Sequence, residues 1–416
     1  MIELGLARIG RLLERTNLPW RAIHVAGTNG KGSICAYLSA MLHAANVRCG
    51  RFTSPHLIDR WDCITIDENV VKESLFREVE AHVNRRNAKD GIGAFEFELL
   101  TATAFDIFYQ EQVEVGVVEV GLGGRLDATN VLQNSLVTVI SKIGQDHQAL
   151  LGNTVEEIAY QKAGIMRPGV PCVVDSTNKA SVLEVLDTYA KEIGAGPLIK
   201  VPEIDSRDSR LRDFFRETDL EPHQQVNLRC AFEALRQALK QLRLNLDPLD
   251  LLQATKNTSW LGRLQKESIE SLTGRKEKIL IDGAHNAQSA GVLGSFVDRK
   301  FRQGNQSVTW VLAASRGKEL QELLLPLIHA GDGVVAVEFG PVGGMPWVKP
   351  AASKDLLEMA RRSVELGGQQ DARSDVLGAL RWSSEVAGGG PLVVAGSLYL
   401  VSDVLRLLRD VERGLQ

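Results

Sequence analysis

One ten-residue stretch restricts the folds open to this 416-residue chain more than any other feature. Residues 24–33 read HVAGTNGKGS, and an apolar run, Ala22–Ala26, leads into them. Apolar residues then recur at helical spacing from Ser33 to Ala45, which predicts a strand, a glycine-rich loop and a helix in succession. Backbone N–H groups and the positive end of a helix converge in such a loop, so the stretch predicts a phosphate-binding site.

The loop departs from the usual phosphate-binding pattern, in which a serine or threonine directly follows the lysine. Here Gly32 separates Lys31 from Ser33. Gly27, Gly30 and Gly32 would let backbone N–H groups approach an anion, and Lys31 would supply a charge for the β and γ phosphates. Ser33 would either cap the helix or bind Mg²⁺. The alternative is a glycine-rich turn that only reverses the chain.

Strand-like apolar runs alternate with helical segments along the chain, which is typical of an α/β fold with mostly parallel sheets. We expect a P-loop-type N-terminal ATPase domain, residues 1–256, and a smaller Rossmann-like C-terminal domain, residues 257–416. Ligands in such sheets bind at the carboxyl ends of the strands, so we expect the two domains to share a cleft. The runs that predict strands are 22–26, 112–120, 135–140, 171–174, 278–281, 308–313, 333–339 and 392–395.

Composition argues against several classes of protein. A net charge of −4 gives no reason to expect nucleic acid or an anionic membrane as a partner. The sequence contains no run of about 18 apolar residues that would predict a membrane span, and its N-terminus lacks the apolar core of a secretory signal. The five cysteines form no CxxC pair, which favours reduced, buried thiols. We expect a cytoplasmic protein, although these features do not exclude a mitochondrial one.

Three residues at or after the predicted strands could bind a cation. Glu119 lies near the end of the second strand, where a buried carboxylate needs a cation or an ion pair, and Arg125 is the alternative partner. His147 follows the third strand and could be a metal ligand, a base or a simple hydrogen-bonding residue. Lys162 lies on the apolar face of a predicted helix, so its ammonium must reach solvent, pair with an acid or lose its charge. A neutral lysine can also react with CO₂ to form a carbamate, which is an oxygen ligand for Mg²⁺.

The C-terminal domain again has polar residues at strand ends. The sequence IDGAHN, 281–286, places Asp282 and His285 after a predicted strand, and Arg263 lies in the connection before it. An arginine in that position could bind phosphates. The alternative is that IDGAHN only forms a turn and that Arg263 is an exposed residue.

Together these motifs resemble the folate branch of the Mur ligases, dihydrofolate synthases and folylpolyglutamate synthases. The resemblance extends over most of the chain and follows the family's order. It implies a Mur ligase-like fold and an ATP- and Mg²⁺-dependent ligase that joins L-glutamate to a folate-type carboxylate through an acyl phosphate. The motifs are HVAGTNGKGS, RFTSPHL (51–57), FEFELLTATAF (95–105), EVGLGGRLDATN (119–130), DH (146–147), QKAGIMRPG (161–169), HQQVN (223–227), LGR (261–263), IDGAHN and GSLYLV (396–401).

The resemblance also implies roles for individual residues. The family's Mg²⁺-binding hydroxyl lies two places after the lysine, which is Ser33 here. Ser33 and Glu119 would hold one Mg²⁺, and Glu119, His147 and a carbamylated Lys162 would hold a second; a monovalent cation is left open. The catalytic residues would be Lys31, Glu119, His147, Lys162 and His285. ATP would contact Gly27, Thr28, Asn29, Gly30, Lys31, Gly32, Ser33, Asn227, Arg263 and Asp282, and the pterin substrate would contact Thr53, Ser54, Pro55, His56 and Arg125.

Within the family the sequence favours a dihydrofolate synthase, which adds the first glutamate to 7,8-dihydropteroate. Asn29 resembles the loop of dihydrofolate synthases and bacterial bifunctional enzymes, whereas many eukaryotic polyglutamate synthases have lysine there. The alternatives are a folylpolyglutamate synthase or bifunctional enzyme that extends the tail of a reduced folate, and a non-catalytic nucleotide-binding regulatory protein. The TSPHL motif argues against a cell-wall Mur ligase. Residues 58–64, IDRWDCI, depart from the family pattern, which leaves their role open, and we expect a monomer.

Overall fold

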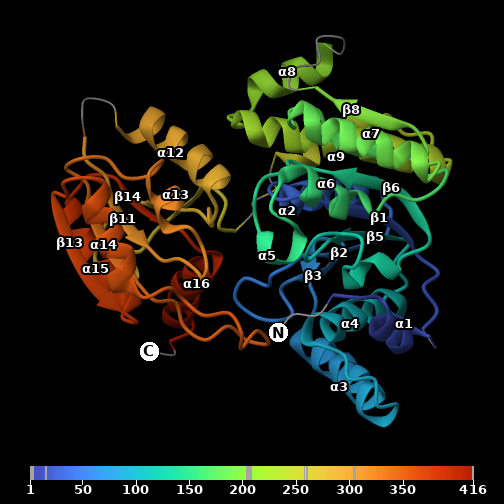
Figure 1. Ribbon diagram of the computed structural model, residues 1–416, viewed down its shortest axis with the longest axis horizontal. Helices are drawn as coiled ribbons and strands as arrows, with labels where there is room; N and C mark the ends of the chain where they lie inside the picture. The colour runs from blue at the N-terminus through green and yellow to red at the C-terminus, as the bar shows by residue number, and fades with distance from the viewer. Residues whose placement is uncertain are drawn as a thin grey trace. The chain divides into compact units, whose positions relative to one another are not determined.

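The computed structural model describes residues 4–14, 16–202, 209–256, 258, 261–302 and 306–414. The chain forms two compact units, each of which is an α/β fold as the sequence predicts (Figure 1). Unit 1 contains Met1–His56 and Trp61–Thr258, and unit 2 contains Leu57–Arg60 and Ser259–Gln416. Residues 257, 259 and 260 of the predicted connection, and 203–208 of the polar stretch before it, lie outside the described residues.

Unit 1 is built on an eight-stranded sheet in the order β4-β3-β2-β5-β1-β6-β7-β8. Strands β2, β5, β1, β6, β7 and β8, in that order, pair in parallel. Strands β3 and β4 add an antiparallel edge next to β2. The phosphate loop follows the central strand, β1, so it emerges in the middle of the sheet's carboxyl edge. The strands are β1 (Arg21–Ala26), β2 (Cys49–Phe52), β3 (Ile64–Ile66), β4 (Asn69–Val70), β5 (Val115–Glu119), β6 (Ser135–Ile140), β7 (Cys172–Asp175) and β8 (Leu198–Val201).

Helices cover both faces of this sheet, which is why β1 is apolar on both sides. Ile23 and Val25 belong to one core cluster, whereas Ala22 and Ala26 belong to clusters on the opposite face. The helices of unit 1 are α1 (Ala7–Leu13), α2 (Lys31–Ala44), α3 (Glu73–Lys89), α4 (Glu96–Gln110), α5 (Gln148–Leu151), α6 (Val155–Ala163), α7 (Ala180–Glu192), α8 (Ser209–Glu217), α9 (Pro222–Leu242) and α10 (Pro248–Leu251), with 3₁₀ turns η1 (Ala128–Val131) and η2 (Leu252–Thr255).

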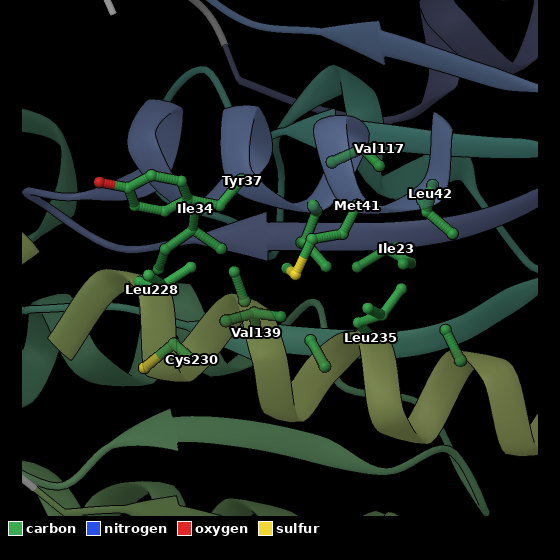
Figure 2. Close-up of a cluster of buried hydrophobic side chains, with 14 of the residues drawn as sticks. Ile23, Ile34, Tyr37, Met41, Leu42, Val117, Val139, Leu228, Cys230 and Leu235 are labelled. Atoms are coloured by element: carbon green, nitrogen blue, oxygen red, sulfur yellow. The ribbon is translucent and has the colours of Figure 1, made fainter. Parts of the chain in front are cut away.

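The helix after the phosphate loop is held in place by α9. Figure 2 shows Ile34 and Met41 of α2 directed toward Leu228 and Leu235 of α9, with Val139 of β6 beside them. All five side chains are fully buried. Apolar packing between α2 and α9 therefore fixes the direction in which the N-terminus of α2 points.

Unit 2 contains a six-stranded sheet in the order β13-β12-β11-β14-β10-β9. Its strands pair in parallel except for the edge strand β9, and core clusters line both of its faces. Its elements are β9 (Gln265–Glu267), α11 (Glu270–Thr273), β10 (Ile279–Ile281), α12 (Ala287–Phe301), β11 (Thr309–Leu312), α13 (Leu320–Leu324), β12 (Gly333–Val337), α14 (Ser353–Ser363), β13 (Gly368–Arg373), α15 (Val376–Ala387), β14 (Leu392–Ala395) and α16 (Leu398–Glu412).

Four residues of the predicted first domain belong to unit 2 instead. Leu57 and Ile58 pack against the core cluster that includes α16, and Arg406 of that helix donates a hydrogen bond to the Ile58 carbonyl oxygen at 3.1 Å. Arg409 forms an ion pair with Asp59. These contacts join positions about 350 residues apart in the sequence, so local sequence patterns do not reveal them.

Two predictions from composition concern the described residues. None of the helices in these ranges is long and apolar enough to cross a membrane. All five cysteines are free and buried, as predicted.

Candidate active site

The phosphate loop begins where β1 ends. Gly30 is in the left-handed region, with a φ of 91°, and it is the N-cap of α2. The helix therefore begins at Lys31 rather than near Ser33 as the sequence analysis predicts, and Ser33 lies in its first turn. The positive end of a 14-residue helix thus faces the loop.

Two loop glycines are required by close protein neighbours. A Cβ atom on Gly27 would lie 1.8 Å from Oγ of Ser141, and one on Gly30 would lie 2.3 Å from Oδ1 of Asn227. Ser141 also donates a hydrogen bond to the Asn29 carbonyl oxygen at 2.8 Å. Asn227 lies beside Gly30 because its helix, α9, packs along α2. The structure thus places Asn227, one of the residues predicted to contact ATP, against the phosphate loop.

A carboxylate and an ammonium meet beside this loop. Glu119 is 5% exposed at the end of β5, and Nζ of Lys31 lies 3.6 Å from its Oε1. Lys31 also donates a hydrogen bond to the Thr28 carbonyl oxygen at 3.2 Å. The alternative partner, Arg125, instead places its guanidinium 5.6 Å from the centre of the Tyr160 ring. A buried carboxylate beside a positive helix end has the oxygen chemistry that Mg²⁺ prefers, so Glu119 and Ser33 fit a metal ligand role.

Lys162 is buried, as its position on an apolar helix face predicts. It lies near the end of α6, which begins at a capping box formed by Thr154 and Glu157. Its side chain donates a hydrogen bond from Nζ to the Gly27 carbonyl oxygen at 2.7 Å. Burial, reinforced by the positive charge of Lys31, lowers the pKa of Lys162 from 10.5 to about 7. This lysine therefore exchanges readily between its charged and neutral forms near neutral pH.

His147 does not follow its strand directly. Strand β6 ends at Ile140, and His147 is the N-cap of the short helix α5, with a φ of 53°. Its backbone N–H donates to Asp146 Oδ1 at 2.9 Å, and its side chain is 51% exposed. Within the described residues, no group of three or more His, Cys, Asp and Glu side chains gathers as a metal cluster. The predicted ligand set draws on Ser33 and Lys162 as well, and it remains a prediction.

The predicted substrate segment contacts the same carboxylate. The backbone N–H of Ser54 donates a hydrogen bond to Oε2 of Glu119 at 3.3 Å, and the Ser54–Pro55 peptide bond is cis. Thr53 and His56 are both buried. Residues 53–56 therefore lie beside the carboxylate that pairs with Lys31.

Two of the predicted residues of unit 2, Asp282 and His285, lie in the loop after β10, and Arg263, which precedes β9, lies near them. Asp282 is buried and accepts hydrogen bonds from the backbone N–H groups of Leu264 and Ala284, both at 2.8 Å. Burial raises the pKa of this carboxyl, and the charge of Arg263 opposes that rise. His285 places Nδ1 2.9 Å from the Gly283 carbonyl oxygen. Asp282 therefore shapes a turn, as one of the two predictions for IDGAHN has it, and its carboxylate lies near Arg263 and His285.

The sequence motifs did not single out one set of buried polar side chains in unit 1. His24, Thr129 and Asp127 form a buried hydrogen-bonded chain behind the phosphate loop. The signal in the sequence was a single histidine within the apolar strand that precedes the loop.

Comparison with known proteins identifies the family. The model of the dihydrofolate synthetase C-terminal domain matches residues 265–407. A Saccharomyces cerevisiae dihydrofolate synthetase is 38% identical over 98% of this chain and 98% of its own length. The structure of E. coli FolC in complex with DHPP and ADP superposes with a TM-score of 0.80 and 26% identity, over 99% of this chain and 94% of that one. A Yersinia pestis bifunctional folylpolyglutamate synthase/dihydrofolate synthase with Mn, AMPPNP and L-glutamate bound gives 0.77 and 27%, over 98% and 95%. The chain belongs to the family of dihydrofolate synthases and folylpolyglutamate synthases.

Proposed function

We propose that this protein is a dihydrofolate synthase, which uses ATP to join L-glutamate to 7,8-dihydropteroate. The observation that carries the proposal is that Lys31, Glu119 and Lys162 lie together at the N-terminus of α2 and the loop before it. Lys31 and the N-terminus of a helix suit a ligand that is strongly anionic, and the buried carboxylate of Glu119 suits a divalent cation that arrives with it. The family relationship supplies the substrates that make this arrangement useful.

The chemistry follows from the poor reactivity of a carboxylate. The γ-phosphoryl group of ATP moves to the carboxylate of dihydropteroate, and ADP leaves. The amine of L-glutamate then attacks the acyl phosphate, an amide bond forms, and phosphate leaves with the former carboxylate oxygen. Lys31 and the first turn of α2 neutralise charge on the phosphates during transfer, and residues 53–56 orient the pterin substrate.

Mg²⁺, when bound, reduces the repulsion between the triphosphate and the incoming carboxylate. Ser33 and Glu119 would hold one ion. Lys162 would join Glu119 and His147 at a second ion after its neutral amine forms a bond to the carbon of CO₂ and releases one proton. The low pKa of Lys162 supports this step because it supplies the neutral amine near pH 7.

The direct test is an assay of purified protein with ATP, L-glutamate and 7,8-dihydropteroate, in which ADP release and dihydrofolate formation are measured together. Lys31→Ala is expected to lower kcat by about 10²–10³-fold, because it removes a group that stabilises transferring charge. Lys142→Met is the matched control, since Lys142 donates its hydrogen bonds to Thr177 and has no proposed role in the reaction. An active Lys31→Ala protein would contradict the proposed site.

The assay also separates the two activities of the family. Asn29 favours the first glutamate addition, and turnover of tetrahydrofolate but not of dihydropteroate would instead identify a folylpolyglutamate synthase. ATP binding without substrate-dependent ADP release would indicate a regulatory protein.

The carbamate has its own test. Protein exposed to ¹³CO₂ should show a carbamate ¹³C signal that Lys162→Ala lacks, and a short carboxylic acid should restore part of the activity of Lys162→Ala. Size-exclusion chromatography with light scattering tests the expected monomer, and cell fractionation tests the expected cytoplasmic location.

A further inference from the structure

A buried histidine lies on β1, and the reaction described above does not use it. His24 has no exposed surface and lies between Ala22 and Ala26 on one face of the strand. Its Nε2 lies 2.8 Å from Oγ1 of Thr129, whereas its buried Nδ1 has no hydrogen-bond partner among the described residues. An unsatisfied buried polar atom costs about 1–3 kcal/mol. An apolar residue would therefore suit this strand better if the position only filled the core.

The direction of the hydrogen bonds shows what His24 does. Asp127 accepts bonds from the Leu122 backbone N–H at 2.7 Å and the Thr129 backbone N–H at 3.0 Å, one on each carboxylate oxygen; burial raises the pKa of this carboxyl, and these bonds oppose that rise by favouring the ionised form. The Thr129 hydroxyl donates its single hydrogen to the same carboxylate at 2.5 Å. The hydroxyl oxygen must then accept from Nε2–H of His24. Burial lowers the pKa of His24 to about 3, so the ring is neutral and can carry its hydrogen on Nε2.

The loop held by Asp127 is packed tightly against α6. The Arg125 backbone N–H donates to the Gln161 carbonyl oxygen at 2.8 Å. A Cβ atom on Gly124 would lie 2.8 Å from that oxygen and 3.0 Å from Cα of Lys162. Residues 122–131 therefore set the position of the helix segment that carries Lys162.

These contacts form a closed ring within unit 1. His24 bonds to Thr129 of the 122–131 loop, and that loop bonds to α6. Lys162 of α6 then bonds to the carbonyl oxygen of Gly27, three residues after His24, which closes the ring. Strand β1 carries one end of the arrangement, and the residue that directly follows β1, Gly27, carries the other. Without the bond from His24 to Thr129, the bonds of Arg125 to Gln161, of Asn130 to Gly164 and of Lys162 to Gly27 remain, but the 122–131 loop is no longer tied to β1 through Thr129.

We propose that His24 is a positioning residue for the reaction: through Thr129, it holds the 122–131 loop so that Lys162 stays beside the phosphate loop. This inference rests on the proposed function, because that function is what requires Lys162 at this point. Groups that act behind metal ligands and catalytic residues commonly change activity by about 10–100-fold.

Four variants test the proposal. His24→Met and Thr129→Val remove the link, whereas His24→Gln keeps a donor at a similar reach. Thr138→Val is the matched control: Thr138 is also fully buried and pairs in register with His24 on β6, and its hydroxyl contacts the Pro171 carbonyl oxygen at 3.5 Å and the Cys172 thiol, away from the 122–131 loop. We expect kcat to fall about 10–100-fold in His24→Met and Thr129→Val, with KM for ATP changed less than about threefold.

The pattern across variants separates positioning from general destabilisation. We expect His24→Gln and Thr138→Val to keep kcat within about threefold of the wild type. The double variant His24→Met/Thr129→Val should be no slower than either single variant, because both break one link. The proposal is overturned if His24→Gln is as slow as His24→Met, or if Thr138→Val loses activity equally for the same loss of melting temperature.

Hydrogen exchange keeps the test independent of turnover. In His24→Met, the peptides covering residues 121–131 and 155–165 should exchange faster than in the wild type, and in Thr138→Val they should not. Unchanged exchange in His24→Met would overturn the inference even in an active enzyme. Faster exchange in His24→Met, combined with a wild-type protein that shows no ligase activity, would uphold the ring and reject the proposed function.

Discussion

Lys162→Met is expected to make the ligand-free protein more stable and to abolish its ligase activity. Lys162 is 4% exposed, and burial lowers its pKa from 10.5 to about 7. A shift of this size corresponds to about 4–5 kcal/mol that disfavours the folded state at pH 7, at about 1.4 kcal/mol per pKa unit. Methionine has a similar length, carries no charge and adapts to irregular cores.

The lost hydrogen bond offsets part of this gain. Lys162 donates to the Gly27 carbonyl oxygen, and leaving a buried carbonyl without its donor costs about 1–3 kcal/mol. The net effect at pH 7 is therefore a stabilisation of about 1–4 kcal/mol. Because the folded pKa is lowered, the unfolded state binds more protons between pH 7 and 10.5, and wild-type stability rises with pH in that window. From pH 7 to pH 9 the advantage of Lys162→Met should shrink by about 2 kcal/mol.

The assay is native-state hydrogen exchange of β1 and α6 peptides, which reports the local free energy of opening in unit 1. CO₂-free buffer with a chelator keeps the lysine unmodified and the protein free of metal. Lys142→Met provides the control, because its ammonium bonds to Thr177 and should show no comparable gain. The reasoning is refuted if Lys162→Met is less stable than the wild type at pH 7, or if the difference is the same at pH 7 and pH 9.

Three further predictions concern groups elsewhere in the fold. His24→Gln should remove a pH dependence of stability. Burial lowers the pKa of His24 from 6.5 to about 3, so the unfolded state takes up the proton first as pH falls. Between pH 7.5 and pH 5 the wild type should therefore lose about 2 kcal/mol more of its free energy of opening than the variant, measured by hydrogen exchange of β1. Gly124→Ala should cost about 1–3 kcal/mol by overpacking, because its Cβ would lie 2.8 Å from the Gln161 carbonyl oxygen, and kcat should fall with it. Asp332→Asn should destabilise unit 2 by about 3–5 kcal/mol, because the Arg302 side chain, 10% exposed, would lose its buried ion pair. Hydrogen exchange of β11 and β12 measures this loss, and an unchanged exchange rate would show that the pair contributes little.

Local patterns in the sequence were sufficient for the elements that bury two faces. The runs SLVTVI and LVVA coincide with β6 and β14, because a central parallel strand is a short apolar segment with clear ends. The boundaries of α2 were wrong by two residues at its start, since the left-handed Gly30 allows the helix to begin directly at Lys31. The helical spacing of the apolar residues around Lys162 was sufficient to predict its burial.

Features that depend on distant segments were not predicted. Strand β2 is only four residues long and includes Arg51, so its apolar signal is weak. The partner of His24 is 105 residues away, and nothing near His24 indicates Thr129. Motifs and apolar patterns in the sequence therefore predict the candidate site residues. The residues that position them, such as His24 and Thr129, are recognised only in the folded structure.

The assignment of Leu57–Arg60 to unit 2 affects how the protein can be divided. A fragment that starts at Ser259 would lack the segment that packs on the core cluster beside α16. Apolar surface on that cluster would then face water, and Arg406 and Arg409 would lose their bonds to Ile58 and Asp59. Cleaving the polypeptide once between the units would thus yield an incomplete C-terminal piece, prone to self-association, whereas grafting residues 57–60 onto it through a short linker should restore its solubility.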